Sequence, residues 1–291
     1  MHSNLLYNGQ IRSTSEKLLS PGQVGLVNGW GVFSTIRVWD GVLFAFDRHW
    51  TRMRRDAGLL SVPFPTDADS IHDQLLRLVE ANQALNATLR VIVVRNKGGM
   101  WEGPSIERDY DLIAFTTGLQ DWGGGVSLAI QPQARHAASP LAGVKMLSWS
   151  FNLLWLEHAR QRGFDEVILL NERGEVSECT SANIFAAQGD EVWTPPLSSG
   201  CLPGVTRELL LHEIQATGVS VREKTLLPAD LEAARELFIT STTRVMLPVR
   251  NVEGREVRQQ GSTRERLQSA FSRFAEDYVR NAPRRAGVLV P

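Results

Sequence analysis

Cysteine is scarce in this sequence: Cys179 and Cys201 are the only two among 291 residues. A zinc site or a redox motif needs cysteines in closely spaced pairs, and these two lie too far apart along the chain. Disulfides are rare in the cytosol, so we expect two free, buried thiols and no metal site.

Net charge is nearly absent as well, because 31 basic residues are balanced by 32 acidic ones, which leaves a formal charge of −1. This balance provides no general attraction to nucleic acid or to a membrane surface. No apolar stretch is long enough to span a bilayer, and the first residues lack the basic patch and apolar run of a secretory signal. We therefore expect a cytoplasmic protein without nucleic-acid or membrane partners, which binds any anionic ligand through local groups.

The composition is that of an ordinary globular protein, with 43% hydrophobic and 22% charged residues. A chain of this length exceeds what one core usually supports. Three consecutive glycines, Gly123 to Gly125, disfavour the interior of a helix or a strand. We therefore expect a small N-terminal α/β domain at 1–119, a linker at 120–125 and a larger domain at 126–291.

In the first domain the pair Asp40-Gly41 predicts a β-hairpin over residues 32–46. Asp47 is the predicted N-cap of a helix over 48–60, because Trp50, Met53 and Ala57 recur at helical spacing. The other elements expected here are a short strand at 5–11 with a turn at Asn8-Gly9, a helix that begins at 67–70, and strands at 88–95 and 111–116.

The second domain reads as strand pairs joined by short turns, so its sheet is predicted to be mainly antiparallel or mixed. The whole chain then falls in the α/β (α+β) class. The expected strands are 126–131, 165–170, 175–179, 182–187, 191–194 and 236–241, and the expected helices are 150–162, 203–218, 227–234 and 261–280.

Two ionisable residues stand in apolar surroundings. Lys145 lies in the run Leu141 to Leu147, where burial would lower the pKa of its amine toward the neutral form that attacks an aldehyde. Glu178 lies among small and apolar neighbours, where an anion can keep a pyridine nitrogen protonated. The alternatives are a surface lysine, and a carboxylate that caps a turn or pairs with an arginine.

Two turns offer hydroxyls and free backbone N–H groups. Residues 202–207, Leu-Pro-Gly-Val-Thr-Arg, open a helix whose first N–H groups can bind phosphate. The second turn, Thr240 to Arg244, ends a strand. Each is also explained as ordinary capping or as a polar strand end.

Taken together, these segments resemble the fold-type IV pyridoxal phosphate (PLP) enzymes: branched-chain aminotransferases, D-amino acid aminotransferases and aminodeoxychorismate lyases. The resemblance covers nearly the whole chain. It is carried by residues 29–37 with Asp40-Gly41, by His49 to Arg52, Lys145, Glu178 to Phe185, Leu202 to Arg207, Thr240 to Thr243 and Leu247 to Val249.

The resemblance implies a role for each matching position. Lys145 corresponds to the Schiff-base lysine and catalytic base, Glu178 to the partner of the pyridine nitrogen, and Leu202 to the residue on the ring face. Arg52, Val205, Thr206 and Thr242 correspond to phosphate-binding positions, and Thr242 and Thr243 to N–H groups that hold a substrate carboxylate.

The resemblance further implies amino acid and 2-oxo acid substrates and a homodimer. The expected activity is an aminotransferase acting on an apolar or aromatic, branched-chain-like amino acid. Arg95, a substrate-binding candidate, could meet a second carboxylate or be a surface charge, as could Arg37 and Lys97. The tryptophans at 30, 101, 122 and 149 are candidates for an aromatic lining or for plain core or interface residues. The alternatives are a lyase that releases pyruvate, since the cofactor handling is shared, or a catalytically silent member of the fold. The sequence lacks the tyrosine pattern of the branched-chain enzymes and the histidine pattern of the D-amino acid enzymes, and these departures concern the substrate.

Overall fold

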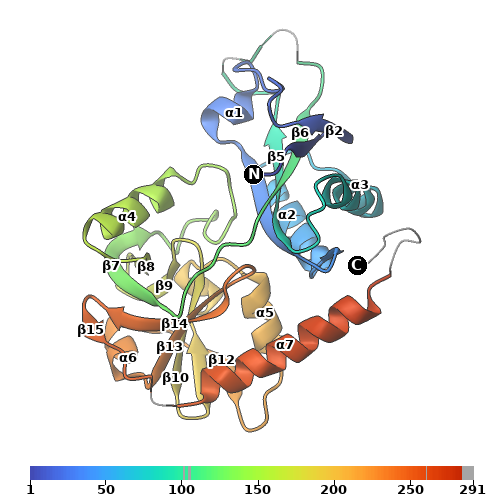
Figure 1. The fold of residues 1–291 in the computed structure, drawn as a ribbon. Helices are drawn as coiled ribbons and strands as arrows, with labels where there is room; N and C mark the ends of the chain where they lie inside the picture. The colour runs from blue at the N-terminus through green and yellow to red at the C-terminus, as the bar shows by residue number, and fades with distance from the viewer. Residues whose placement is uncertain (101, 104–105, 260, 284–291) are drawn as a thin grey trace.

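Two β-sheets, one from each half of the chain, organise the structure (Figure 1). It is a computed structural model that describes residues 1–100, 102–103, 106–259 and 261–283. The first sheet has six strands in the order β2-β1-β6-β5-β3-β4, and each neighbouring pair is antiparallel. Its strands are β1 (Asn4–Tyr7), β2 (Gln10–Ser13), β3 (Gly31–Trp39), β4 (Val42–Leu43), β5 (Ala87–Arg95) and β6 (Tyr110–Thr117).

The predicted hairpin is confirmed by the pairing of β3 with β4. Asp40 and Gly41 both have positive φ, at 47° and 79°, as a tight two-residue hairpin turn requires. Side chains alternate between the two faces of this sheet. On β5, Leu89, Val91 and Val93 are buried in the hydrophobic core, so the residues between them face the other way.

Helices α2 (Phe46–Leu59) and α3 (Ala68–Ala81) contribute to the same core. Asp67 caps α3 by accepting a hydrogen bond from the Ser70 N–H at 2.9 Å. The prediction that Asp47 caps α2 is wrong, because the helix begins at Phe46 and Ala45 is its N-cap. Packing decides this start: Phe46 is buried and stacks on Trp50, which draws residue 46 into the first turn.

The second sheet has nine strands and is mixed, as predicted. Its order is β12-β11-β10-β13-β14-β7-β8-β9, with β15 paired to β14. Three pairs are parallel, namely β11 with β12, β14 with β7 and β7 with β8. The strands are β7 (Val126–Arg135), β8 (Glu166–Asn171), β9 (Val176–Cys179), β10 (Asn183–Gln188), β11 (Glu191–Thr194), β12 (Ser220–Glu223), β13 (Glu236–Ser241), β14 (Val245–Val252) and β15 (Arg255–Glu256).

The helices of this half agree with the expected positions, with one exception. The helix predicted over 203–218 ends at His212, because Ile214 and Ala216 turn into the core ahead of β12. Helix α1 (Val24–Asn28) and strands β12 and β14 lack a helical or alternating pattern strong enough to predict them. The helices are α4 (Ser150–Gln161), α5 (Val205–His212), α6 (Pro228–Ala233) and α7 (Thr263–Asn281), with a 3-10 turn η1 (Leu197–Ser199).

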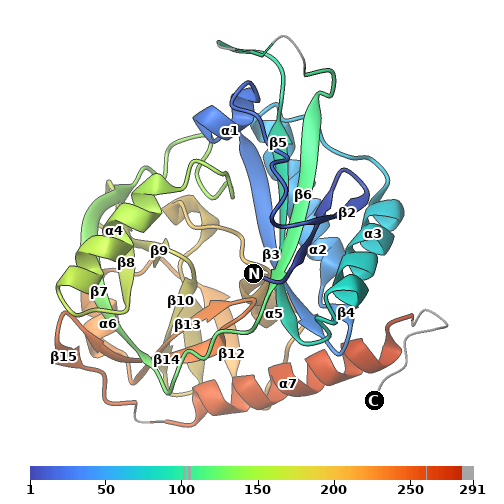
Figure 2. The same ribbon diagram turned by 45° about the horizontal axis from the view of Figure 1, so that its top comes forward.

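We propose residues 120–125 as the linker between domains 1–119 and 126–291, because β6 ends at Thr117 and β7 begins at Val126. The two halves also share a contact across this division. Helix α7 extends along the second sheet toward the first half (Figures 1 and 2), and Phe44 meets Phe271 and Tyr278 with ring centroids 5.8 and 5.1 Å apart.

Cys179 and Cys201 are free and buried, as predicted. Among the helices that the structure describes, none is long and apolar enough to cross a membrane.

Candidate active site

A cavity of about 610 Å³ is lined by residues from both halves of the chain. Eight of the nine predicted site residues line this one cavity: Arg52, Lys145, Glu178, Leu202, Val205, Thr206, Thr242 and Thr243. The amine and the carboxylate on which the sequence argument depends therefore share one cavity.

Lys145 extends from a short segment that pairs with the edge of β3 through a bridge between Met146 and Val32. Its Nζ lies 4.5 Å from the centre of the Phe33 ring and 5.4 Å from the centre of the Trp149 ring. Burial, reinforced by the positive charge of Arg52, lowers the pKa of Lys145 from 10.5 to about 7. A large fraction of this amine is therefore neutral near pH 7.

Glu178 lies on β9 and is 8% exposed. One carboxylate oxygen, Oε1, accepts from Arg135 Nε at 3.2 Å, and the other, Oε2, accepts from the Leu202 N–H at 3.0 Å. The carboxylate is thus both paired with an arginine and fixed to the turn before α5. Because a carboxylate offers about four lone-pair directions, it can still accept a further donor from the cavity.

Two glycines allow close approaches around the turn before α5: Gly204 in the turn itself and Gly143 in the lysine segment that meets it. A side chain at Gly204 would come within 2.0 Å of Asn183 Oδ1, and one at Gly143 would come within 2.6 Å of the Cys201 carbonyl. Gly143 also has φ +71°, in the region that favours glycine. These close contacts bring the lysine segment and the helix entrance together.

Arg52 projects from α2 to the same helix entrance. Its side chain donates to Ser34 Oγ at 2.9 Å and to the Pro203 carbonyl at 3.3 Å, while its buried Nε has no partner among the described residues. Burial lowers the pKa of Arg52 to about 10, so the guanidinium remains charged at neutral pH. His49, which shares Ser34 Oγ, has a pKa held well below its usual range by burial and is neutral.

The turn between β13 and β14 closes another side of the cavity with Thr240 to Arg244. The buried Thr240 Oγ1 has no partner among the described residues. Val245, which follows the turn, has φ +56°, an unfavourable conformation for a β-branched residue. Such strain is typical of turns whose shape is set by a binding site.

Arg95, the ninth predicted residue, does not line this cavity. Its guanidinium lies 4.2 Å from the centre of the Trp30 ring, and its Nε donates to the Lys97 carbonyl. Arg90, also on β5, lines the cavity instead, 3.9 Å from the centre of the Phe33 ring. Side chains an odd number of positions apart on a strand point to opposite faces of the sheet, which explains why Arg90 and Arg95 face different sides.

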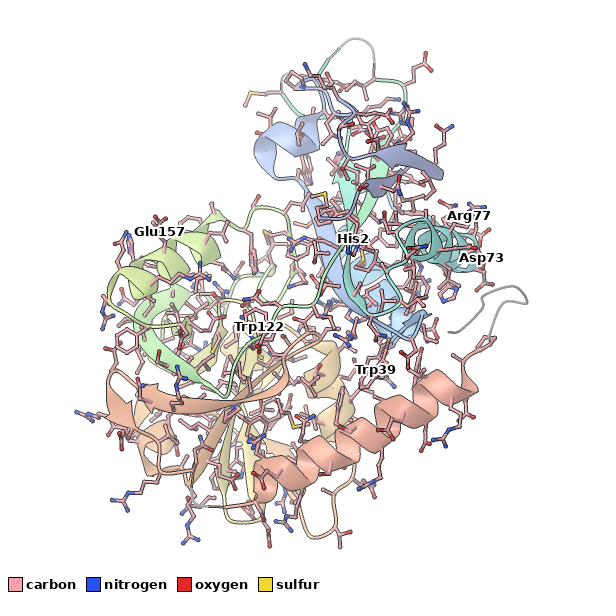
Figure 3. All side chains as sticks on the ribbon, in the orientation of Figure 1. His2, Trp39, Asp73, Arg77, Trp122 and Glu157 are labelled. Carbon is pink, nitrogen blue, oxygen red and sulfur yellow. The ribbon has the colours of Figure 1, made fainter. Side chains whose placement is uncertain are left out.

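Of the four tryptophans suggested as a lining, Trp122 and Trp149 line the cavity. Figure 3 shows Trp122 on the segment that passes between the two halves, and the Arg244 guanidinium lies 3.9 Å from its ring centre. Trp30 donates its indole N–H to the Leu60 carbonyl, and Trp101 lies outside the described residues.

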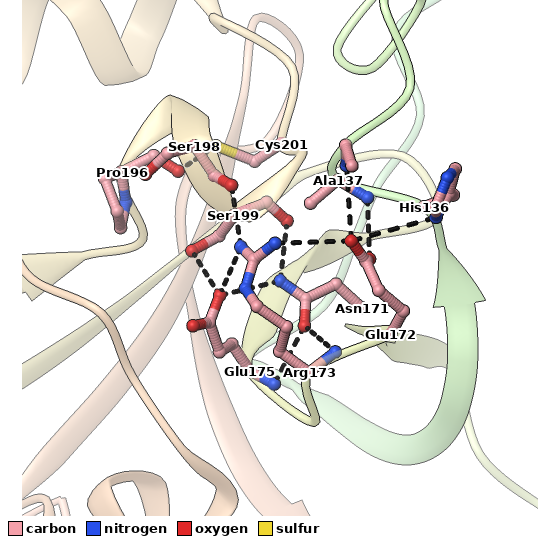
Figure 4. A network of polar contacts seen from close by, with 11 residues as sticks. His136, Ala137, Asn171, Glu172, Arg173, Glu175, Pro196, Ser198, Ser199 and Cys201 are labelled. Atoms are coloured by element: carbon pink, nitrogen blue, oxygen red, sulfur yellow. Dashed lines mark hydrogen bonds and ion pairs between the residues drawn. The ribbon is translucent and has the colours of Figure 1, made fainter.

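A polar network joins two loops that lead to site residues (Figure 4). Glu172 accepts from the Ala137 and Ala138 N–H groups, ahead of the lysine segment. Its neighbour Arg173 donates to the Ser198 carbonyl at 2.8 Å, ahead of the turn at Leu202. The hairpin turn between β8 and β9 therefore holds both the loop that precedes Lys145 and the loop that precedes Leu202.

Sequence reasoning missed Arg90, Arg135 and Phe33. Arg90 and Phe33 could have been found from strand alternation, because both occupy the face of the sheet opposite to the buried core positions. Arg135, at the end of β7, had no such signal, because its contact with Glu178 joins strands far apart in sequence.

A lysine amine of lowered pKa, a fixed carboxylate and a helix entrance around one cavity are the groups that a coenzyme-dependent amine chemistry uses. The family model described as amino-transferase class IV matches residues 31–252. The chain therefore belongs to the class IV aminotransferase family and is an enzyme of that class, as the resemblance implied.

Two curated relatives are similar over most of the chain. A D-alanine aminotransferase from Bacillus licheniformis is 28% identical over 257 residues, which cover 87% of this chain and 89% of the relative. A branched-chain-amino-acid aminotransferase from Salmonella typhimurium is 28% identical over 279 residues, which cover 91% of this chain and 90% of the relative.

Solved structures share the fold. Branched-chain amino acid aminotransferase from Escherichia coli superimposes with a TM-score of 0.85 at 24% identity and covers 94% of this chain and 95% of its own. A hypothetical aminotransferase from Mycobacterium tuberculosis in PLP-bound form gives a TM-score of 0.78 at 23% identity, covering 92% and 98%. The mixed α/β fold is thus that of the fold-type IV aminotransferases.

Proposed function

We propose that this protein is a PLP-dependent aminotransferase that moves an amino group between an apolar or aromatic amino acid and a 2-oxo acid. The observation that supports it most directly is the shared cavity of Lys145, with a pKa near 7, and Glu178. Family membership supports the same reaction class.

The residues around the cavity fit PLP. Arg52 Nε and Thr240 Oγ1 are buried donors without a partner among the described residues, and the first N–H groups of α5 open on the same cavity. Arg52, Val205, Thr206 and Thr242 would hold the phosphate, Leu202 would cover the ring, and Glu178 would meet the ring nitrogen. When bound, the coenzyme supplies an aldehyde carbon and a ring that accepts electrons from the substrate.

The protein's own contribution is to bind, orient and transfer a proton. A neutral Lys145 Nζ can attack an aldehyde and can take the proton from the substrate Cα, which an ammonium cannot do. The Thr242 and Thr243 backbone N–H groups are proposed to orient the substrate carboxylate. Phe33, Trp122 and Trp149 provide apolar surface for a side chain.

The test is spectroscopic. Purified protein incubated with PLP is expected to gain a visible absorption band that survives gel filtration, whereas Lys145→Ala is expected to lack it. Lys17→Ala, at an exposed position, is the matched control. A protein that stays colourless with added PLP would contradict the proposal and favour a silent member of the fold.

The lyase remains the second candidate, because the residues proposed to hold PLP serve either outcome. A panel of L- and D-amino acids, assayed for 2-oxo acid formation beside aminodeoxychorismate, separates the two. Pyruvate from aminodeoxychorismate without any transamination would move the assignment to the lyase.

We also propose a homodimer in the cytoplasm. Exposed apolar side chains lie on α1 and α4 and beside the cavity, namely Leu26, Val27, Leu141, Phe151, Leu153 and Leu154. The Ser148 hydroxyl donates to the Asn28 carbonyl and so joins the end of α1 to the segment before α4. Light scattering of Phe151→Glu, set beside wild type, tests whether this surface joins two copies. The free thiols of Cys179 and Cys201 support a reducing compartment.

A further inference from the structure

Asp56 is a fully buried carboxylate that touches the backbone of the lysine segment. Its Oδ2 accepts a hydrogen bond from the Lys145 backbone N–H at 3.1 Å, across 89 positions of sequence. Its Oδ1 accepts from Arg55 Nε at 2.9 Å. Asp56 is 0% exposed, so a carboxylate there is stabilised only by the donors that reach it.

Other backbone groups of this segment also form hydrogen bonds with the first half of the chain. The Lys145 carbonyl accepts from the Phe33 N–H at 3.2 Å, and the Leu147 N–H donates to the Gly31 carbonyl at 2.9 Å. Arg55 donates to the Gly143 carbonyl at 3.3 Å. The backbone around Lys145 is thus held by hydrogen bonds to β3 and α2, whereas Glu178 belongs to the second sheet.

Asp56 and Arg52 are one helical turn apart on α2, so they lie on the same face of that helix. Arg52 reaches the Pro203 carbonyl at the entrance of α5, and Asp56 reaches the Lys145 N–H. One rigid helix therefore sets the distance between the lysine backbone and the proposed phosphate site.

We propose that Asp56 is a positioning residue that fixes the Lys145 backbone relative to Arg52 by holding the Lys145 N–H. This proposal rests on the proposed function in one respect: the hydrogen bond matters for catalysis only if the Lys145 amine must be correctly placed for PLP. The contact itself exists without the coenzyme and can be measured without it.

Amide hydrogen exchange of the apo protein, resolved at Lys145 by fragmentation of a peptide spanning residues 143–147, is the primary test. Asp56→Ala removes the acceptor, so the Lys145 amide is expected to exchange at least about tenfold faster, as expected for loss of a hydrogen bond to a charged group. Asp47→Ala, an exposed position in the first turn of the same helix, is expected to leave that rate unchanged.

Two further variants separate the hydrogen bond from the neighbouring ion pair. Arg55→Leu removes the pair and also the bond from Arg55 to the Gly143 carbonyl, but it leaves the Asp56 acceptor, so slow exchange at Lys145 is expected to persist. The second variant combines Arg55→Leu with Asp56→Asn. Without the Arg55 guanidinium, the side-chain oxygen of the new amide is free to accept the Lys145 N–H, so exchange is expected to be slow again compared with Asp56→Ala. If Asp56→Ala does not fold, this double variant decides alone: slow exchange supports the proposal and fast exchange overturns it.

The second readout is the dissociation constant of PLP from the apo protein, measured by absorbance. Asp56→Ala is expected to weaken binding about tenfold, and Arg55→Leu to bind as wild type does. Exchange at Lys145 that is unaffected by Asp56→Ala, or equally fast in Arg55→Leu, would overturn the proposal. Failure of wild type to bind PLP would instead refute the proposed function and leave the exchange result standing.

Discussion

Arg135 Nε lies 3.2 Å from Glu178 Oε1, and the two side chains are only 19% and 11% exposed. Arg135 also donates to Asn152 Oδ1 at 3.1 Å, and Asn152 donates to the Thr180 carbonyl at 2.6 Å. The carboxylate proposed to meet the coenzyme ring is therefore held by a chain of polar contacts from β7, α4 and the turn after β9.

Removing Arg135 leaves this poorly solvated carboxylate with the Leu202 N–H as its one hydrogen-bond donor among the described residues. We expect Arg135→Met to lower the free energy of unfolding by about 2 kcal/mol, because breaking a mostly buried pair exposes the cost of its desolvation. Denaturant titration of the apo protein measures it. Arg12→Met, which removes an exposed pair with Glu16, is the control and is expected to show no change. Equal stabilities of all three proteins would contradict the prediction.

The lowered pKa of Lys145 predicts a pH-dependent stability. Between pH 7 and 10.5 the unfolded chain holds a proton on this amine that the folded chain has released, so stability rises with pH over that window. Below pH 7 the folded protein bears the full cost of a buried ammonium. We expect apo Lys145→Met to be more stable than wild type at pH 7 and to lose this advantage by about pH 10, as followed by denaturant titration. An advantage that does not vary with pH would be inconsistent with a lowered pKa.

Arg52 is expected to contribute most of the phosphate affinity, because its buried guanidinium has a free Nε among the described residues. We expect Arg52→Met to raise the dissociation constant of PLP by about a hundredfold, as measured by absorbance titration. Arg54→Met, at an exposed position on the same helix, is the matched control. Identical affinities for the two variants would remove Arg52 from the proposed phosphate site.

Arg90 and Arg95 give a direct comparison on one strand. The Arg90 side chain lines the cavity and makes no hydrogen bond or ion pair with the described residues, so it is available to a second carboxylate of a substrate. Arg90→Met is expected to raise KM for a 2-oxo acid that carries a second carboxylate by about tenfold or more, with a smaller effect on kcat. Arg95→Met is expected to leave both constants unchanged, and the reverse pattern would restore the sequence-based assignment of Arg95.

Local patterns allowed much of the fold to be predicted. The hairpin at Asp40-Gly41 depends on a turn whose positive φ angles these two residues tolerate, and α3 begins where Asp67 can cap it. The start of α2 and the end of α5 could not be read in this way. There the burial of Phe46 and of Ile214 overrides the capping and spacing signals, and burial depends on distant residues.

The candidate site divides in the same way. Lys145 and Glu178 could be singled out because an ionisable group in an apolar run is conspicuous in one dimension, and the resemblance supplied roles for the others. By contrast, the ion pair of Arg135 with Glu178 joins residues 43 positions apart, and the hydrogen bond from the Lys145 N–H to Asp56 joins residues 89 positions apart. No local pattern could indicate either contact.

By itself, the sequence determined the type of most elements and the identity of the groups that can carry the chemistry, because turn, capping and side-chain properties are local. Only the tertiary structure decided which arginine faces the cavity and which carboxylate holds the lysine backbone. The reason is physical: strand register and helix packing are set by the whole core, and a shift of one position on a strand sends a side chain to the opposite face.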